Sequence, residues 1–249
     1  MIAVVVPCYN EEKRLDVDAF LAALGEWPAL SFRMVDDGSK DGTLDVLRDL
    51  EARAPAGRVR VHVLERNSGK AEAVRQGVLA ELEGDASYVG YWDADLATPL
   101  DEIPVFATIL DERADVDIVL GSRVKLLGRR IERRLYRHLY GRLFATSVSL
   151  ILGLPVYDTQ CGAKLFRNSD AAAHAFGEGF LSRWIFDVEM LARFVDHWRS
   201  EGVNAEDRIV EKPLRQWVDV AGSKIGVQDA ARAFVELAQI RRRYRRVLR

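Results

Sequence analysis

The sequence contains few cysteines. Only Cys8 and Cys161 occur among 249 residues, and they lie far apart. This number and spacing exclude a disulfide scaffold and a cysteine zinc site. Scarce cysteine is typical of a protein that resides in a reducing cytoplasm. We therefore expect both thiols to be small packing groups rather than nucleophiles.

Long apolar segments are also missing. Residues 143–156 form the best candidate, but they are too short and too polar to cross a bilayer alone. Near the N-terminus, Pro7 and the acidic pair Glu11 and Glu12 interrupt a short apolar run, so no signal peptide is predicted. The sequence thus predicts a cytoplasmic protein without a membrane span of its own.

A large net charge is absent as well. Lys and Arg number 36 against 38 Asp and Glu, a balance of -2 that argues against a nucleic-acid partner. Basic residues are nevertheless concentrated in two stretches. Residues 129–142 hold six Arg and one His against one Glu, and residues 241–249 hold six Arg and no acid. Such stretches are either solvated helix faces or surfaces that attract phosphates of a membrane or a substrate.

Apolar runs of strand length alternate with amphipathic stretches along the chain. The runs predicted as strands are 2–6, 32–35, 60–65, 88–92 and 117–121. This alternation predicts an α/β fold with a mainly parallel sheet and helices on both faces. We expect a single domain over residues 1–225, containing a basic-to-apolar interfacial helical region at 129–154. A basic C-terminal helix is predicted over 226–249.

Every predicted strand ends on polar residues. In chain order these are Tyr9-Asn10-Glu11, Asp36-Asp37, Asn67, Asp93 with Asp95, and Arg123. The carboxyl ends of parallel strands meet at one edge of the sheet, where ligands of α/β proteins bind. One polar strand end is only a turn, whereas five that converge on one edge predict a functional site.

The segment Asp93-Ala94-Asp95 has the most specific chemistry. Two carboxylates just beyond a buried strand can share Mg²⁺ or Mn²⁺ with substrate phosphates, and the cation would neutralise a leaving diphosphate. A lone pair of this kind is more often a solvated turn, but the neighbouring polar strand ends favour a site. Dehalogenase-type phosphatases use a similar D-x-D-x-[TV] motif. Ala97 occupies the fifth position here and the motif lies mid-chain, which disfavours that alternative.

One further strand end and one helix start offer nucleotide contacts. Asp36 and Asp37 belong to a Gly- and Ser-rich stretch that could be a plain strand-to-helix turn, or could accept from a base or from ribose hydroxyls. Lys70 follows Gly69 at the start of a predicted helix, where backbone N–H groups favour phosphate. Neither a Walker P-loop nor G-x-G-x-x-G is present, so a dinucleotide-dependent oxidoreductase is not expected.

These pieces in this order resemble a known family. "VVVPCYNEEKRL", "VDDGSKDGT", "NSGKAEAVRQG", "DADLATP" and "GSR" resemble the inverting GT-A (Rossmann-like) glycosyltransferases of family 2, over about residues 2–225. "YDTQCGAKLF", "RWIFDVEML" and "GSK" narrow the resemblance to the polyprenyl-phosphate sugar transferases. Within that group, the glucosyl type resembles this chain more than the mannosyl type. The motifs are weak singly and specific as an ordered set.

The resemblance implies roles for individual residues. Asp93 and Asp95 would hold the metal, and together with Arg123 and Arg137 they are the predicted catalytic residues. The predicted nucleotide-sugar contacts are Pro7, Tyr9, Glu11, Asp36, Asp37, Lys70, Asp93, Ala94, Asp95 and Arg123. The predicted acceptor and diphosphate contacts are Arg133, Arg137, Gln160, Lys164 and Lys224. Mannose synthases usually carry a Gln metal ligand where this chain has Ala97, so the third protein ligand is left open.

The predicted reaction is an inverting transfer of a sugar, with UDP-glucose as the first-choice donor and a polyprenyl (dolichyl-type) phosphate as acceptor, assisted by Mg²⁺ or Mn²⁺. Three alternatives stay open: another donor such as GDP-mannose, a soluble acceptor, and a sugar-nucleotide-binding module without turnover. The region 129–154 predicts a peripheral position on the cytoplasmic face of a membrane, unless a partner protein supplies the anchor. Asp187 and Glu189 are either polar neighbours of the site or helix-surface residues.

Overall fold

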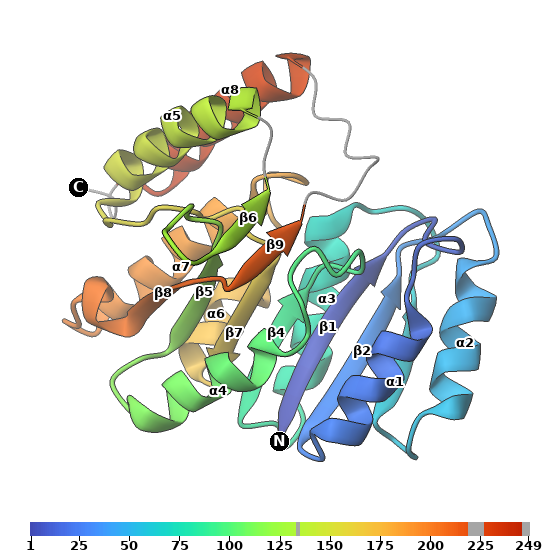
Figure 1. The fold of residues 1–249 in the computed structure, drawn as a ribbon. Coiled ribbons are helices and arrows are strands. Elements are labelled where there is room, and N and C mark those ends of the chain that lie inside the picture. The colour runs from blue at the N-terminus through green and yellow to red at the C-terminus, as the bar shows by residue number, and fades with distance from the viewer. Residues whose placement is uncertain (133–134, 219–226, 246–249) are drawn as a thin grey trace.

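The structure is a computed structural model that describes residues 1–132, 135–218 and 227–245, without the side chains of 132, 135–140 and 227–231 (Figure 1). Seven strands form one sheet in the order β3-β2-β1-β4-β7-β5-β8. Their bounds are β1 (Ile2–Cys8), β2 (Leu30–Asp36), β3 (Val59–Val63), β4 (Tyr88–Trp92), β5 (Ile118–Ser122), β7 (Ala163–Arg167) and β8 (Ile209–Pro213). Two short strands, β6 (Arg130–Glu132) and β9 (Gln216–Val218), pair in parallel beside this sheet.

Helices cover both faces of the sheet (Figure 1). One face carries α1 (Val17–Glu26), α2 (Thr43–Arg53) and α4 (Glu102–Glu112). The other carries α3 (Lys70–Leu82), α6 (Asp170–Gly177) and α7 (Phe186–Ser200). Two further helices, α5 (Leu135–Leu152) and α8 (Val227–Arg243), lie side by side beyond the carboxyl ends of the strands. A 3-10 turn, η1 (Ala205–Arg208), precedes β8.

The central strand β1 contributes to both hydrophobic cores. Val5 packs into the core beneath α3, while Val4 and Val6 pack into the core beneath α1 and α4. All three side chains are fully buried. A strand buried on both faces is apolar at consecutive positions rather than at alternate ones. This explains why residues 2–6 are an uninterrupted apolar run.

Strand β7 is the exception to the parallel arrangement. It pairs antiparallel with β4 on one side and with β5 on the other, and Ala163 lies opposite Trp92. The sequence predicted a mainly parallel sheet, which is confirmed, but it did not predict this inserted strand. Because β7 runs in the opposite direction, the loop before it reaches the same edge as the carboxyl ends of its neighbours.

The five predicted strands are all present, with ends displaced by a few residues. Helix α1 begins only at Val17, after a turn in which the backbone N–H of Arg14 donates to the carbonyl oxygen of Glu11. Residues 129–154 were expected to be helical, but Arg130–Glu132 form β6 because they pair with β9. The predicted domain boundary at 225 falls within 219–226, outside the described residues.

Within the three described ranges, no helix combines the length and the apolar composition that crossing a bilayer requires.

Candidate active site

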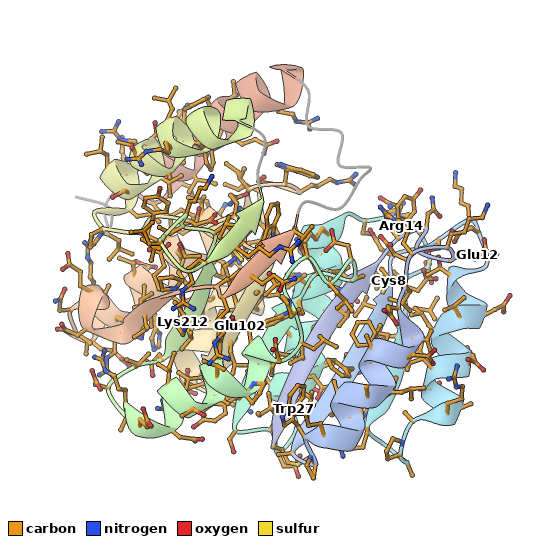
Figure 2. All side chains as sticks on the ribbon, viewed as in Figure 1. Cys8, Glu12, Arg14, Trp27, Glu102 and Lys212 are labelled. Carbon is orange, nitrogen blue, oxygen red and sulfur yellow. The ribbon has the colours of Figure 1, made fainter. Side chains whose placement is uncertain are left out.

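The loops that follow β1, β2, β4 and β5 meet at one edge of the sheet. Strand β1 lies between β2 and β4, so the loop after Cys8 lies between the Asp36-Asp37 pair and the Asp93–Asp95 segment. Glu12 and Arg14 lie at this edge, whereas Trp27 lies at the opposite end of the strands (Figure 2). The predicted convergence of polar strand ends is therefore present in the fold.

Asp93, the residue after β4, is held by contacts from the loop before β7 and from the start of α3. Its backbone N–H donates to the carbonyl oxygen of Gly162 at 2.9 Å. Its carboxylate Oδ1 lies 2.5 Å from Nζ of Lys70, the first residue of α3. Both side chains remain about one-third exposed, at 35% and 36%. Asp93 at the end of β4 and Lys70 at the start of α3, where the sequence predicted phosphate binding, thus form an ion pair.

Asp95 adds a second negative charge to this pair. Its carboxylate accepts the backbone N–H of Ala97 at 3.1 Å, which fixes the turn after β4. The surrounding protein and the charge of Asp93 raise the pKa of Asp95, while Lys70 acts in the opposite direction. Although burial acts to lower the pKa of Lys70, the charges of Asp93, Asp187 and Asp95 raise it overall, so the ammonium persists. The carboxylates of Asp93 and Asp95 repel each other, and the single Lys70 ammonium does not balance both. Binding of an additional positive charge beside them is therefore favourable.

Asp36 and Asp37 shape the loops of this edge. Each is only 3% exposed. The Asp37 carboxylate accepts the backbone N–H groups of Ser68 at 2.7 Å and Gly69 at 2.9 Å, and it thereby positions the start of α3. Burial raises the pKa of Asp37 in spite of these bonds. Asp36 accepts from the backbone of Ser39 at 3.2 Å. Contact of either carboxylate with a nucleoside stays a prediction.

The loop after β1 holds Tyr9 and Glu11. Tyr9 is 38% exposed, as expected for the rim of a site. Glu11 is largely buried and pairs through Oε1 with Arg14 at 2.6 Å. Its second oxygen, Oε2, has no hydrogen-bond partner among the described residues. Burial raises the pKa of Glu11, and the charge of Asp95 contributes in the same direction. Pro7 is a partly buried residue of β1 and Ala94 packs into the core.

Arg123, at the end of β5, is paired within the protein. Its guanidinium forms two bonds with the Asp158 carboxylate, at 2.7 and 2.8 Å, and its backbone N–H donates to the same group. The guanidinium also lies over the Trp217 ring, 5.4 Å from the centroid. Although burial acts to lower the pKa of Arg123, Asp158 raises it further above its usual range. Arg123 therefore anchors the loop that leads into β7.

Lys164 does not lie where its predicted role requires. Its side chain has no exposed surface, so in this structure it cannot contact a diphosphate or an acceptor directly. The ammonium lies 2.5 Å from Oδ1 of Asp187 and 2.6 Å from the carbonyl oxygen of Cys161. The hydroxyl of Tyr91 also bonds to Asp187. The lysine is buried because β7 is a central strand, and its charge is matched by a carboxylate from α7.

Asp187 and Glu189, in the first turn of α7, are both buried rather than on a helix surface. Asp187 is 4% exposed and Glu189 is fully buried. Glu189 pairs with Arg193 at 2.9 Å and accepts from the hydroxyl of Tyr244, which attaches α8 to α7. The charge of Asp187 contributes to the raised pKa of Lys70, so its role as a polar neighbour of the site stays a prediction.

The remaining predicted acceptor contacts are only partly covered by the structure. Arg133 and Lys224 lie outside the described residues, and the side chain of Arg137 in α5 is not described. Gln160 lies in the loop before β7, where its backbone N–H donates to Asp158 at 3.2 Å. Its Nε2 is buried without a partner among the described residues. These acceptor roles stay predictions.

Sequence reasoning missed Asp158 and Gly162, although both lie in the "YDTQCGAKLF" segment that it singled out. Asp158 fixes Arg123, and Gly162 lies against the carboxylate of Asp93. A glycine between the small residues Cys161 and Ala163 could have signalled a close approach of another group. The approach itself depends on the antiparallel strand β7, which the sequence pattern did not predict.

Comparison with known proteins agrees with this fold. The sequence model of glycosyl transferase family 2 matches residues 3–173. The chain therefore belongs to glycosyl transferase family 2, and it is a glycosyltransferase. The predicted family and enzyme class are confirmed.

Two relatives show the sequence similarity in more detail. The dolichyl-phosphate beta-glucosyltransferase of Dictyostelium discoideum is 29% identical over 256 residues, covering 98% of this chain and 74% of the relative. The Homo sapiens enzyme of the same name is 36% identical over 205 residues, covering 76% of this chain. This chain spans 61% of the length of the human relative.

A solved structure shows the similarity of fold. Glucosyl-3-phosphoglycerate synthase of M. tuberculosis superposes with a TM-score of 0.68 at 17% identity, covering 96% of this chain and 80% of the synthase. The predicted GT-A arrangement is thereby confirmed. The same synthase has also been solved with Mn²⁺, UDP-glucose and phosphoglyceric acid, and that structure superposes with a TM-score of 0.66.

Proposed function

We propose that this glycosyltransferase moves glucose from UDP-glucose to a polyprenyl phosphate of the dolichyl type, with inversion at the anomeric carbon. The sugar and the acceptor are those in the names of the relatives that cover most of the chain. The observation that carries the proposal is the site itself, in which Asp93 and Asp95 lie beside the Lys70 ammonium at the carboxyl edge of the sheet.

The residues at this edge fit a divalent cation such as Mg²⁺ or Mn²⁺. Carboxylate oxygens are the donors that these ions prefer, and substrate phosphates commonly complete the coordination. The ammonium already paired with Asp93 shows that this position attracts positive charge. Asp93 and Asp95 would hold the cation, and the unpartnered Oε2 of Glu11 is a further acceptor at this edge. When bound, the cation would withdraw charge from the leaving diphosphate.

The chain's own residues orient the two substrates. Lys70 and the backbone N–H groups at the start of α3 favour the negatively charged diphosphate. A phosphate monoester has a second pKa of about 6, so its oxygen is largely ionised near neutral pH and needs no strong general base. The predicted acceptor contacts Arg133 and Arg137 would draw the acceptor phosphate toward the donor. The rate gain would come mainly from orientation and from stabilised charge.

The lipid acceptor requires contact with a membrane surface, which we assign to α5 and α8. On α5, Phe144, Val148 and Leu152 are buried at helical spacing, whereas Leu143 and Leu150 are 61% and 79% exposed. On α8, Val235 is 59% exposed and Arg241–Arg243 are exposed at the end of the helix. Exposed leucines with nearby basic residues suit an interfacial position. We propose that the protein works as a peripheral enzyme on the cytoplasmic face of a membrane or beside an anchoring partner.

An incubation with a polyprenyl phosphate and Mn²⁺ tests the proposal. UDP-glucose and GDP-mannose are compared as donors, and 3-phosphoglycerate serves as a soluble acceptor. Glucolipid formed from UDP-glucose supports the proposal. Transfer only to the soluble acceptor, or only from GDP-mannose, would replace its acceptor or its donor, and nucleotide binding without any transfer would contradict turnover.

The role of the acidic segment is tested within the same assay. Asp95→Ala should lower turnover by more than about 100-fold, because it removes a carboxylate that would hold the cation, and the cation stabilises the charge that develops on the diphosphate. Asp85→Ala, at an exposed residue of the opposite edge of the sheet, is the matched control and should keep full turnover. Equal activity of both variants would remove Asp95 from the site.

A further inference from the structure

Gly162, the residue before β7, lies directly against the carboxylate of Asp93. A β-carbon built on Gly162 would meet Oδ2, Cγ and Oδ1 of Asp93 as its three nearest heavy atoms, all far closer than van der Waals contact. The backbone of Gly162 is not in the left-handed region, which residues with a β-carbon rarely adopt. Glycine is thus required here for space rather than for its backbone freedom.

The two oxygens of Asp93 face different neighbours. Oδ2 is the atom nearest to the position of a β-carbon on Gly162, while Oδ1 pairs with Lys70 at 2.5 Å. The backbone N–H of Asp93 donates to the carbonyl oxygen of Gly162 at 2.9 Å. The side chain therefore packs onto bare backbone on one side and points its other oxygen at the ammonium.

The loop that carries Gly162 is firmly fixed. Asp158 binds the guanidinium of Arg123 through both oxygens. Glu211 of β8 accepts the backbone N–H groups of Tyr157 at 2.8 Å and of Asp158 at 2.6 Å. Since β7 itself is a central strand, this loop has little freedom to retreat. An added methyl group at residue 162 must therefore displace the Asp93 carboxylate rather than the loop.

We propose that Gly162 is a positioning residue for Asp93, which keeps that carboxylate turned toward the cation and diphosphate position. This inference rests on the proposed function, in which Asp93 holds a divalent cation. Residues that orient a metal ligand typically affect metal affinity by about 10- to 100-fold when they are changed. A loss of this size is expected for Gly162→Ala, although alanine leaves the charge of the site unchanged.

The first experiment measures Mn²⁺ binding by electron paramagnetic resonance, with Mn²⁺ alone and with Mn²⁺ plus UDP. Gly162→Ala should weaken Mn²⁺ binding by about 10- to 100-fold relative to the wild type. Gly177→Ala is the matched control, because a β-carbon there meets no heavy atom within 4 Å and its φ is also not left-handed. The control should bind Mn²⁺ like the wild type. Unchanged binding by Gly162→Ala would overturn the proposal.

The second experiment is a double-mutant cycle read by melting temperature, which needs neither metal nor activity. Gly162→Ala should lower the melting temperature in the wild-type background. In the Asp93→Ala background the opposing carboxylate is gone, so the same change should lower it little or not at all. An equal loss in both backgrounds would show that Gly162 acts on something other than Asp93, and would overturn the proposal.

The two experiments separate failure of this inference from failure of the proposed function. A wild-type protein that binds no Mn²⁺, with or without UDP, contradicts the cation site, and the melting-temperature cycle then still decides whether Gly162 positions Asp93. Normal Mn²⁺ binding by the wild type, together with an additive cycle, leaves the proposed function standing and removes Gly162 from it.

Discussion

At the scale of single residues, the polar groups of the active-site edge are bonded to one another as well as exposed to ligands. Arg123 illustrates this arrangement, because its side chain is 15% exposed and pairs with the 8% exposed side chain of Asp158. A buried charge that loses its partner is destabilising, whereas an exposed pair contributes little. The stability of this edge and its chemistry therefore depend on some of the same atoms.

We predict that Asp158→Asn lowers the free energy of unfolding by about 3 kcal/mol, because it leaves the Arg123 charge buried and unmatched. Urea denaturation followed by fluorescence measures the change. Asp115→Asn is the control, since the Arg113–Asp115 pair has a similar distance of 2.5 Å but is half exposed. It should leave the denaturation midpoint unaltered. Similar midpoints for the two variants would contradict a structural role of the Asp158 pair.

Lys70 should set the acid limit of cation binding. Asp95 must be ionised to bind a cation, and its pKa is already raised by the surrounding protein and by Asp93. The Lys70 charge lowers that pKa, so Lys70→Met should raise it further. On acidification, the variant should then lose Mn²⁺ at a higher pH than the wild type does.

The measurement for this prediction is the midpoint pH of Mn²⁺ binding, followed by electron paramagnetic resonance. Lys212→Met on β8, away from the loop that holds Glu12 and Arg14, is the control and should keep the wild-type midpoint (Figure 2). A midpoint that stays the same or moves to lower pH in Lys70→Met would show that the ammonium does not act on Asp95.

At the scale of elements, the position of Lys70 depends on how closely α3 packs on the sheet. Gly77 lies in the middle of this helix, and a β-carbon there would overlap the side chains of Val5 and Val35. Gly77→Ala should lower the free energy of unfolding by about 1–3 kcal/mol through overpacking. Thermal denaturation measures the change. The control is Gly25→Ala in α1, where a β-carbon would meet open space, and it should be neutral or stabilising in the same measurement. A stabilising Gly77→Ala would show that α3 packs less closely than described.

The elements also show how much of the fold the sequence could predict. The doubly buried strands were predictable, because runs such as Ile2–Val6 are apolar at consecutive positions. The direction of β7 was not, because a strand of five residues has the same sequence pattern whichever way it crosses a sheet. Strands β6 and β9 have three residues each and exist only through their pairing, which no local pattern reports.

For the site, the sequence placed the right residues at one edge but not their bonds to one another. Asp93, Asp95 and Lys70 could be grouped, since strand ends and helix starts follow from local pattern. The burial of Lys164 against Asp187 could not be predicted, because the two residues come from elements whose contact is a property of the tertiary fold. The same reason hid Gly162, whose role depends on the position of Asp93.

At the scale of the whole molecule, α5 and α8 lie at the same end as the carboxyl edge of the sheet (Figure 1). A lipid headgroup that reaches this edge would therefore bring its chain past α5 and α8. Exposed leucines on α5 and the exposed arginines of α8 would meet the bilayer together. Such binding should need anionic lipid and should weaken with salt, because the charges act over about a Debye length.

Liposome flotation tests this orientation. Leu143→Ser combined with Leu150→Ser should weaken binding to anionic liposomes by tenfold or more, because withdrawing one leucine from water is worth about 1.5–3 kcal/mol. Val63→Ser is the control, as Val63 is 43% exposed on the edge strand β3. It should bind liposomes like the wild type. Equal flotation of all three proteins would place the membrane contact elsewhere.

The reversed strand β7 also limits how this protein can be recombined with its relatives. One loop, residues 157–162, contacts Asp93 through Gly162 and Arg123 through Asp158. In a chimera joined just upstream of that loop, Asp93 and Arg123 would come from one parent and the loop from the other. Neither contact would then be between residues of the same parent. A junction after Arg167 keeps both contacts within a single parent, so chimeras should be joined there.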